Sequence, residues 1–145
     1  KIFPASNVVS GEQGKGVDGL DILAYLIEKA HAENIKIHAW VNPLRVTTGT
    51  QANPNTDVSK LAAANPARQH HEWTVAYADG KLYYDPAIPE VRKLIADGVK
   101  EIAENYDVDG ILFDDYFYPY PIKGVDFPDN ASFARYGGGF TILIL

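Results

Sequence analysis

The chain has 145 residues, a net charge of −6, and neither cysteine nor methionine. This length allows one hydrophobic core, so we expect residues 1–145 to form a single domain or part of one. Hydrophobic residues make up 46% of the chain, as in ordinary globular proteins, and no apolar run is long enough to cross a membrane. Because the 13 Lys and Arg residues are scattered, no basic patch exists for a phosphate backbone, and nucleic acid is not an expected partner.

The absence of cysteine excludes a disulfide framework, a thiolate nucleophile and a cysteine-ligated metal, and it leaves the redox compartment open. The chain also lacks an initiator methionine and a leader with a charged start and an apolar middle. We therefore expect it to be an excerpt of a longer polypeptide.

The first expected elements are a loop, a helix and a strand. Residues 1–17 are rich in Gly, Ser and Asn, which is typical of a loop. From Leu20 onward, apolar residues recur at helical spacing, and Asp18 or Asp21 is placed to cap the helix. Residues 35–41 then alternate as in a strand, with Ile35, Ile37, Ala39 and Val41 on one face and His38, Trp40 and Asn42 on the other.

The middle of the chain is predicted to be a long loop, a hairpin and a second helix. Residues 43–73 are irregular, with at most a short helix near residues 58–64, and long ordered loops are often functional. The Asp79-Gly80 pair supplies the positive φ angles of a tight hairpin between two short strands. A helix begins near Ile88, with Pro89 in its first turn, and should end near Asn105.

The segment "DGILFDDYFYPYP" contains a second strand with the same pattern as residues 35–41. Both strands follow a helix that ends in Glu-Asn, which indicates repeating βα units and a parallel sheet. In such sheets, binding groups gather at the carboxyl ends of the strands. We therefore expect the two strands to end side by side and to direct Trp40 and Asp114 into a shared cavity.

The consecutive acids Asp114 and Asp115 are the catalytic candidates. Side chains on a strand alternate between faces, so the two acids cannot both meet one ligand while the strand continues. Asp114 shares the parity of Trp40 and is the expected reactive group. Asp115 follows Ile111 and Phe113 toward the helices, where it would support the site or cap a helix.

Several other residues are candidates for substrate binding. An indole face stacks on a sugar ring and an amide bonds to hydroxyls, which favours Trp40 and Asn42. His38 either contacts substrate or fills a barrel interior. Arg45 could hold a carboxylate of an acidic or peptide-bearing glycan, although a loop arginine is more often a surface charge. Roughly half of the ring-bearing residues after Asp115 should form a saccharide platform, and the others should pack over the sheet; they are Tyr116, Phe117, Tyr118 and Tyr120.

The segments "SNVVSGEQGKG", "AHAENIKIHAWVNPLRV", "HHEW", "GKLYYDPAIPEVR", "YDVDGILFDDYFYPYP" and "FPD" resemble the bacterial glycosyl hydrolase-like family ten, also called domain of unknown function 187. The resemblance runs from about Ser6 to Tyr136. It implies a (β/α)8 barrel and a glycosidase of the cell envelope, often a lipoprotein, and Trp73 and Asp85, which lie in these segments, join the substrate-binding candidates. A barrel needs about 250 residues, so this chain would hold a central, incomplete part of one.

A small doubly wound sheet of flavodoxin type is the alternative fold, and it fits the length better, but the chain has no phosphate-binding loop. No cofactor is expected. The cluster His70, His71 and Glu72 lacks the spacing of a helical metal site, so no metal is expected either.

Glycoside hydrolysis usually requires a second carboxyl group on the other side of the scissile bond. The candidates are Asp85, Glu72, Asp126 and an acid outside this chain, and an N-acetyl group of the substrate could act instead. The sequence therefore favours a glycoside hydrolase acting on a bacterial envelope or extracellular polysaccharide. The alternative is a noncatalytic barrel that binds glycans.

Overall fold

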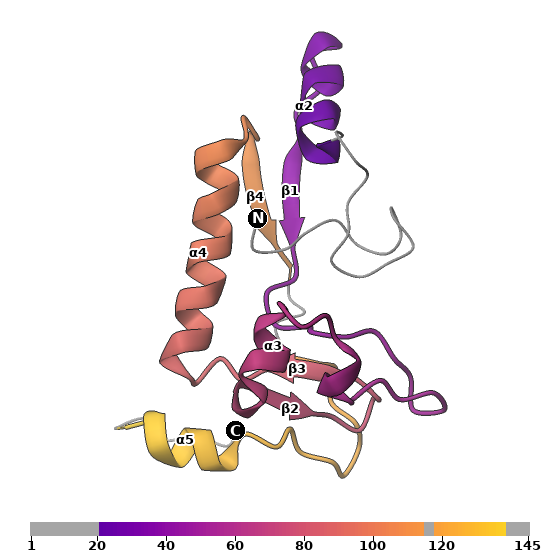
Figure 1. The fold of residues 1–145 in the computed structure, drawn as a ribbon, viewed down its shortest axis with the longest axis vertical. Helices are drawn as coiled ribbons and strands as arrows, with labels where there is room; N and C mark the ends of the chain where they lie inside the picture. Colours follow the sequence, from indigo (N-terminus) through magenta and orange to yellow (C-terminus); the bar gives the residue numbers. More distant parts are fainter. Residues whose placement is uncertain (1–20, 115–117, 139–145) are drawn as a thin grey trace.

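The computed structural model describes residues 21–114 and 118–138. These residues form two small sheets of two strands each, with helices around them (Figure 1). β1 (His38–Val41) pairs in parallel with β4 (Gly110–Phe113), and β2 (Thr74–Ala76) pairs antiparallel with β3 (Leu82–Tyr84). The helical elements are α2 (Ile22–Ala32), η1 (Val58–Lys60), α3 (Pro66–Gln69), η2 (His71–Trp73), α4 (Pro89–Asn105) and α5 (Asn130–Tyr136).

Helix α2 begins and ends as its sequence dictates. Of the two predicted capping residues, Asp21 is the N-cap, and its carboxylate accepts the backbone N–H of Ala24. The chain leaves the helix through Asn34, which has a φ of 56°, a left-handed conformation that Asn tolerates better than most residues. The N–H of Ile35 still bonds to the carbonyl of Ala30. Because Ile35 is still bonded to the helix, β1 begins at His38 and not at Ile35, where the alternation predicted the strand to begin.

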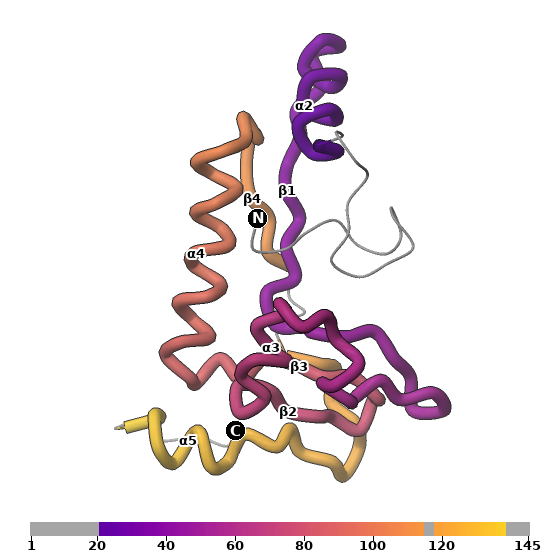
Figure 2. Tube along the Cα trace, viewed as in Figure 1, coloured from indigo at the N-terminus to yellow at the C-terminus, as the bar shows by residue number. Residues whose placement is uncertain are grey.

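The predicted parallel pairing of the two strands is confirmed. Trp40 lies opposite Leu112, and Val41 lies opposite Phe113. The connection between the two strands contains the β2–β3 hairpin and then α4 (Figure 2). The hairpin is therefore part of the loop that leaves the carboxyl end of β1, and α4 is the helix that returns the chain to the start of β4.

Helix α4 has the predicted bounds. Pro89 occupies its first turn, where its missing N–H costs nothing, and the helix ends at Asn105. The hydroxyl of the next residue, Tyr106, donates to Asp21 at 2.8 Å. This bond connects the end of α4 to the start of α2.

The hairpin forms around Asp79-Gly80 as predicted, but with a longer connection than a two-residue turn. The N–H of Gly80 bonds to the carbonyl of Tyr77, and the N–H of Tyr77 bonds to the carbonyl of Lys81. Gly80 has a φ of 87°, whereas Asp79 is not among the positive-φ residues. Asp79 instead closes the turn with its side chain, which accepts the N–H of Lys81.

The long loop contains more helical turns than predicted. The expected short helix is a 3₁₀ turn over Val58–Lys60, capped by Asp57. The unpredicted α3 begins with Pro66, and its N-cap Asn65 accepts the N–H of Ala67. α5 was not predicted either. Its seven residues hold no buried side chain, so they lack the apolar stripe that identifies a helix in a sequence.

The core lies around the hairpin and not under the parallel pair. It consists of Leu44, Leu61, Ala67, Tyr77, Tyr83, Tyr84 and Val91. By contrast, the strand residues Trp40, Leu112 and Phe113 are 68%, 49% and 42% exposed. The hairpin, α3 and α5 lie at the carboxyl ends of β1 and β4, as Figure 1 shows.

The fold class is α/β, and the finer prediction of a barrel is not seen. The described residues contain two separate two-stranded sheets, which are neither a barrel nor a doubly wound sheet. What remains of the prediction is one parallel βαβ-type connection. None of the described helices is both long enough and apolar enough to span a bilayer.

Candidate functional site

The ends of the two parallel strands bring Trp40 and Asp114 together. Trp40 belongs to β1, and Asp114 directly follows β4. The indole Nε1–H donates a hydrogen bond to Oδ2 of Asp114 at 2.9 Å. An indole nitrogen can only donate, so Asp114 is the acceptor, and the bond holds its carboxylate in one orientation. The ring itself remains largely exposed.

A pocket of about 600 Å³ lies beyond the carboxyl ends of the same strands. Its walls come from residues 42–52, from the hairpin and from residues 118–122. The side chains used below are those of Asn42, Arg45, Asp79, Lys81, Tyr83 and Tyr118. Neither Trp40 nor Asp114 lines this pocket, so it is not the cavity that we expected the two side chains to share. The reason is that the strands end before the pocket, and the loops that follow them form its walls.

Three polar side chains that line this pocket are joined by hydrogen bonds. Asp79 accepts hydrogen bonds from Lys81 Nζ at 2.6 Å and from the Tyr83 hydroxyl at 2.7 Å. Burial alone would raise the pKa of Asp79, but these bonds outweigh it and hold the pKa below its ordinary value. Burial and the neighbouring carboxylate both raise the pKa of Tyr83 above its ordinary value. Asp79 is therefore an ionised, fully engaged carboxylate, and Tyr83 remains a neutral donor.

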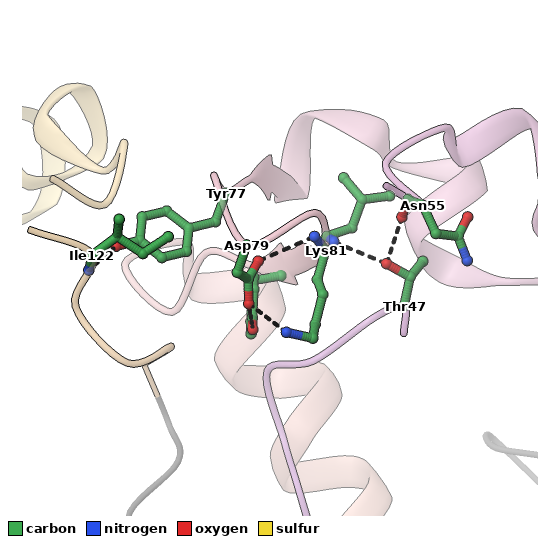
Figure 3. Close-up of polar contacts among 8 residues, drawn as sticks. Thr47, Asn55, Tyr77, Asp79, Lys81 and Ile122 are labelled. Atoms are coloured by element: carbon green, nitrogen blue, oxygen red, sulfur yellow. Dashed lines mark hydrogen bonds and ion pairs between the residues drawn. The ribbon is translucent and has the colours of Figure 1, made fainter. Parts of the chain in front are cut away.

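Hydrogen bonds from the hairpin hold both walls of the pocket in place (Figure 3). The Tyr77 hydroxyl accepts the N–H of Ile122 at 3.0 Å and donates to the carbonyl of Val125 at 3.2 Å. On the other side, the buried Thr47 hydroxyl accepts the N–H of Leu82 and donates to the carbonyl of Asn55. The pocket is therefore shaped by the fold before any ligand arrives.

Four of the residues predicted to bind substrate line the pocket, namely Asn42, Arg45, Tyr118 and Tyr120. Asn42 directly follows β1, and its side-chain oxygen accepts the N–H of Arg45 at 3.1 Å. Arg45 is exposed, and its backbone bridges to Tyr83. Tyr118 packs edge-on against Phe127, with ring centroids 5.2 Å apart. Burial, and then the charge of Asp129, raise the pKa of Tyr118 above its ordinary value, so its hydroxyl stays protonated.

Asp85 is enclosed by the protein and bonds to neighbouring residues of the fold. It is 2% exposed, and its carboxylate accepts the N–H of Ala87 and the hydroxyl of Ser132. It thus shapes the turn before α4 and anchors α5. A carboxylate this enclosed is not positioned to meet a sugar, so its placement favours support over substrate contact.

Trp73 and His38 lie outside the large pocket. Trp73 stacks on His70, with ring centroids 4.0 Å apart, and packs against the core. It lines a second pocket of about 340 Å³ together with Glu72 and Arg135. The imidazole of His38 lies over Gly110 on the parallel pair, where a Cβ would come within 3.0 Å of the ring.

The remaining candidates are placed as follows. Asp115 and Tyr116 lie outside the described residues. Glu72 approaches His70 Nδ1 at 3.2 Å, and Asp126 is exposed. Within residues 21–114 and 118–138, no group of three His, Asp or Glu side chains is arranged to hold a metal ion.

Sequence reasoning missed Asp79, Lys81 and Tyr83 as pocket residues. Asp79 was interpreted only as a turn residue, although all three share one parity.

The chain matches the model of the glycosyl hydrolase-like 10 family over residues 1–142. It is 46% identical to the glycosyl hydrolase YngK of Bacillus subtilis (strain 168) over 134 residues, which cover 92% of this chain and 25% of that protein. It is 36% identical to the glycosyl hydrolase DigH of Escherichia coli (strain K12) over 144 residues, which cover 97% of this chain and 32% of that protein. The chain thus spans a quarter to a third of the length of these relatives.

Proposed function

Because the chain belongs to the glycosyl hydrolase-like 10 family, we propose that its full-length protein hydrolyses glycosidic bonds of a bacterial cell-envelope or extracellular polysaccharide. The single observation that carries the assignment of the reacting group is the hydrogen bond between Trp40 and Asp114. It fixes an aromatic ring and a carboxylate next to each other at the carboxyl ends of two parallel strands, which is where α/β enzymes hold their reacting groups.

In this proposal β1 and β4 are neighbouring strands of a (β/α)8 barrel. Their parallel pairing, with a helix in the connection, is the repeating unit of that fold. Exposed apolar residues on the other face of these strands, such as Phe113, would be covered by strands and helices from the rest of the protein. The hairpin and its pocket then belong to a βα loop, on the face where barrel enzymes bind substrate.

Asp114 serves as acid/base or nucleophile in the proposed mechanism. Trp40 orients its carboxylate and presents an exposed ring to the sugar. We place the second carboxyl group in a part of the full-length protein outside this chain. Asp85 is enclosed with Ser132, Glu72 lies beside His70, and Asp126 does not line the large pocket. Asp79, which does line it, is ion-paired with Lys81.

The test is turnover by the full-length protein carrying Asp114→Asn. Reducing-end release from bacterial wall and exopolysaccharide fragments should fall by about a thousandfold or more, because an amide neither donates a proton nor forms a glycosyl ester. Asp107→Asn is the matched control, since Asp107 is 95% exposed and precedes β4, at the end of the strand away from Asp114. Turnover by Asp114→Asn at the control rate would remove Asp114 from the mechanism.

The same assay separates the enzyme from the noncatalytic alternative. Wild-type protein that binds these fragments without releasing reducing ends would be a glycan-binding barrel. Location in the envelope or outside the cell is part of the proposal, and fractionation of cells that express the full-length protein tests it.

A further inference from the structure

We propose that the pocket at the carboxyl ends of β1 and β4 recognises a carboxylate carried by the saccharide, and that Arg45 is the group that binds it. This inference rests on the proposed function and specifies its substrate as an acidic glycan. Three features support it: the charges that line the pocket, the backbone contacts that hold Arg45, and the apolar residues in the lining.

Arg45 is the available cation of the pocket. Among the described residues, the lining contains two cations, Arg45 and Lys81, and one carboxylate, Asp79. Lys81 lies 2.6 Å from Asp79, so its charge is already compensated. Within the described part of the chain, by contrast, no carboxylate forms an ion pair with the Arg45 guanidinium. The pocket is therefore locally positive in a chain whose net charge is −6.

The neighbours of Asp79 prevent it from turning to Arg45. Its two oxygens receive the N–H of Lys81, the Lys81 ammonium and the Tyr83 hydroxyl. Leaving any of these donors unpaired in this half-enclosed site would cost free energy. Among the described residues, the pocket thus offers Arg45 no carboxylate, which leaves its guanidinium for a ligand.

The backbone of Arg45 is held on both sides. Its N–H donates to the side chain of Asn42, and it forms a β-bridge with Tyr83. The residues flanking it are tied to the hairpin, since Leu44 accepts the N–H of Tyr84 and Val46 donates to Leu82. The guanidinium thus starts from a fixed point beside the pocket, which reduces the entropy lost when it binds.

Another part of the pocket lining suits the body of a sugar. Tyr118, Pro119 and Tyr120 line it, and Tyr120 is 68% exposed. Rings and proline offer rigid apolar surface for the C–H face of a saccharide. A pocket that combines this apolar surface with a guanidinium matches a ring that carries a carboxylate, because a guanidinium fork pairs with both carboxylate oxygens.

The carboxylate can be part of the sugar ring, as in a uronic acid, or be attached to it through an ether. Two pairs of probes distinguish these sources. One pair is tetragalacturonate and its methyl ester, and the other is carboxymethylated chitotetraose and unsubstituted chitotetraose. Affinities are measured by calorimetry with the full-length protein.

We expect the wild type to bind one acidic probe at least about tenfold more tightly than its neutral partner, as a charge-assisted bidentate contact provides. Arg45→Gln should abolish this preference, and Arg45→Lys should retain part of it. Lys100→Gln removes the same charge from the exposed face of α4 and should behave like the wild type. Unchanged thermal unfolding of Arg45→Gln confirms that the variant is folded.

Equal affinity of the wild type for acidic and neutral probes would overturn the inference while leaving the pocket as a saccharide site. If Arg45→Gln kept the preference for the acidic probe, another residue would recognise the carboxylate, and the inference would be overturned as well. Failure of the hydrolase proposal gives a different result, namely acidic probes that bind through Arg45 but no turnover by wild-type protein. Absence of binding by all four probes would remove the pocket from saccharide recognition.

Discussion

The indole Nε1–H of Trp40 donates to Oδ2 of Asp114 at 2.9 Å, a contact between residues 74 positions apart in the chain. Parallel pairing of β1 with β4 makes this contact possible, because it places the two strand ends at one edge. The large exposed surface of Trp40 shows that the ring does not serve the core of the described residues. Its position is better explained by a role toward a ligand.

Replacing Trp40 by Phe should lower turnover of the full-length protein about tenfold while leaving its stability within about 1 kcal/mol. The ring is retained, but the donor that orients Asp114 is lost. Steady-state kinetics and thermal unfolding measure the two effects.

Trp73→Phe is the matched control for Trp40→Phe. Trp73 packs against the core and stacks on His70, so its substitution should reduce stability and leave turnover unchanged. A Trp40→Phe enzyme with wild-type kinetics would show that the hydrogen bond has no part in catalysis.

Replacing Asp85 by Ala should destabilise the protein by about 2–3 kcal/mol, because the N–H of Ala87 and the hydroxyl of Ser132 lose their charged acceptor. Ser132→Ala removes only one of these bonds and should cost less. The double variant should cost less than the sum of the two, since both substitutions break the same contact. If the losses of unfolding free energy of the two single variants, measured in urea, added up to that of the double variant, Asp85 and Ser132 would not be coupled.

The pairing of the strands and the proximity of Trp40 to Asp114 could be predicted from the sequence. Alternation assigned both residues to the same parity, and the repeated helix-to-strand pattern indicated parallel strands, whose carboxyl ends meet at one edge. Both patterns lie within short stretches of the sequence, so they can be recognised without the structure.

The pocket could not be predicted, because its walls meet through contacts without a local signature. The bond from Ile122 to the Tyr77 hydroxyl joins segments 45 positions apart. The enclosure of Asp85 depends in the same way on α5, whose exposed residues gave no helical pattern. The barrel prediction came from a family resemblance, and the described residues include only one parallel strand pair of such a fold.

Replacing Gly80 by Ala should destabilise the protein by more than about 2 kcal/mol, because two separate effects oppose a side chain at this position. The residue has a φ of 87°, a left-handed conformation that favours glycine. A Cβ would also collide with the carbonyl oxygen of Thr50. The collision would displace residues 49–52, so binding in the large pocket should weaken.

Gly124→Ala separates the two causes. Gly124 also has a positive φ, of 76°, but no neighbouring atom lies within 4 Å of the position that a Cβ would occupy there. The substitution should therefore cost only the conformational penalty of about 1–2 kcal/mol. Equal losses of stability for the two variants, measured by urea unfolding, would show that the contact with Thr50 relaxes without cost.

The carboxylate of Asp109 should make stability depend on pH at the opposite end of the parallel pair. It accepts the imidazole of His31 at 3.0 Å and the N–H of Ile37 at 2.8 Å. The hydrogen bond to His31, and then the one to Ile37, lower the pKa of Asp109 below its ordinary value. The folded state therefore favours the ionised form, and this contribution to stability is present above the unfolded pKa of about 3.9.

The contribution should be lost as the pH falls through the unfolded pKa and then the lower folded pKa, because the folded state releases this proton more readily than the unfolded state. Asp109→Asn keeps an acceptor for Ile37 but removes the charge, so its unfolding temperature should lie below that of the wild type at pH 7. The two should draw together as the pH falls through the unfolded pKa and converge below the folded pKa. Asp107→Asn, at a carboxylate 3.8 Å from His31 and 95% exposed, should follow the wild type throughout. A deficit of Asp109→Asn that stays constant from pH 7 to pH 3 would show that the charge of Asp109 does not contribute to stability.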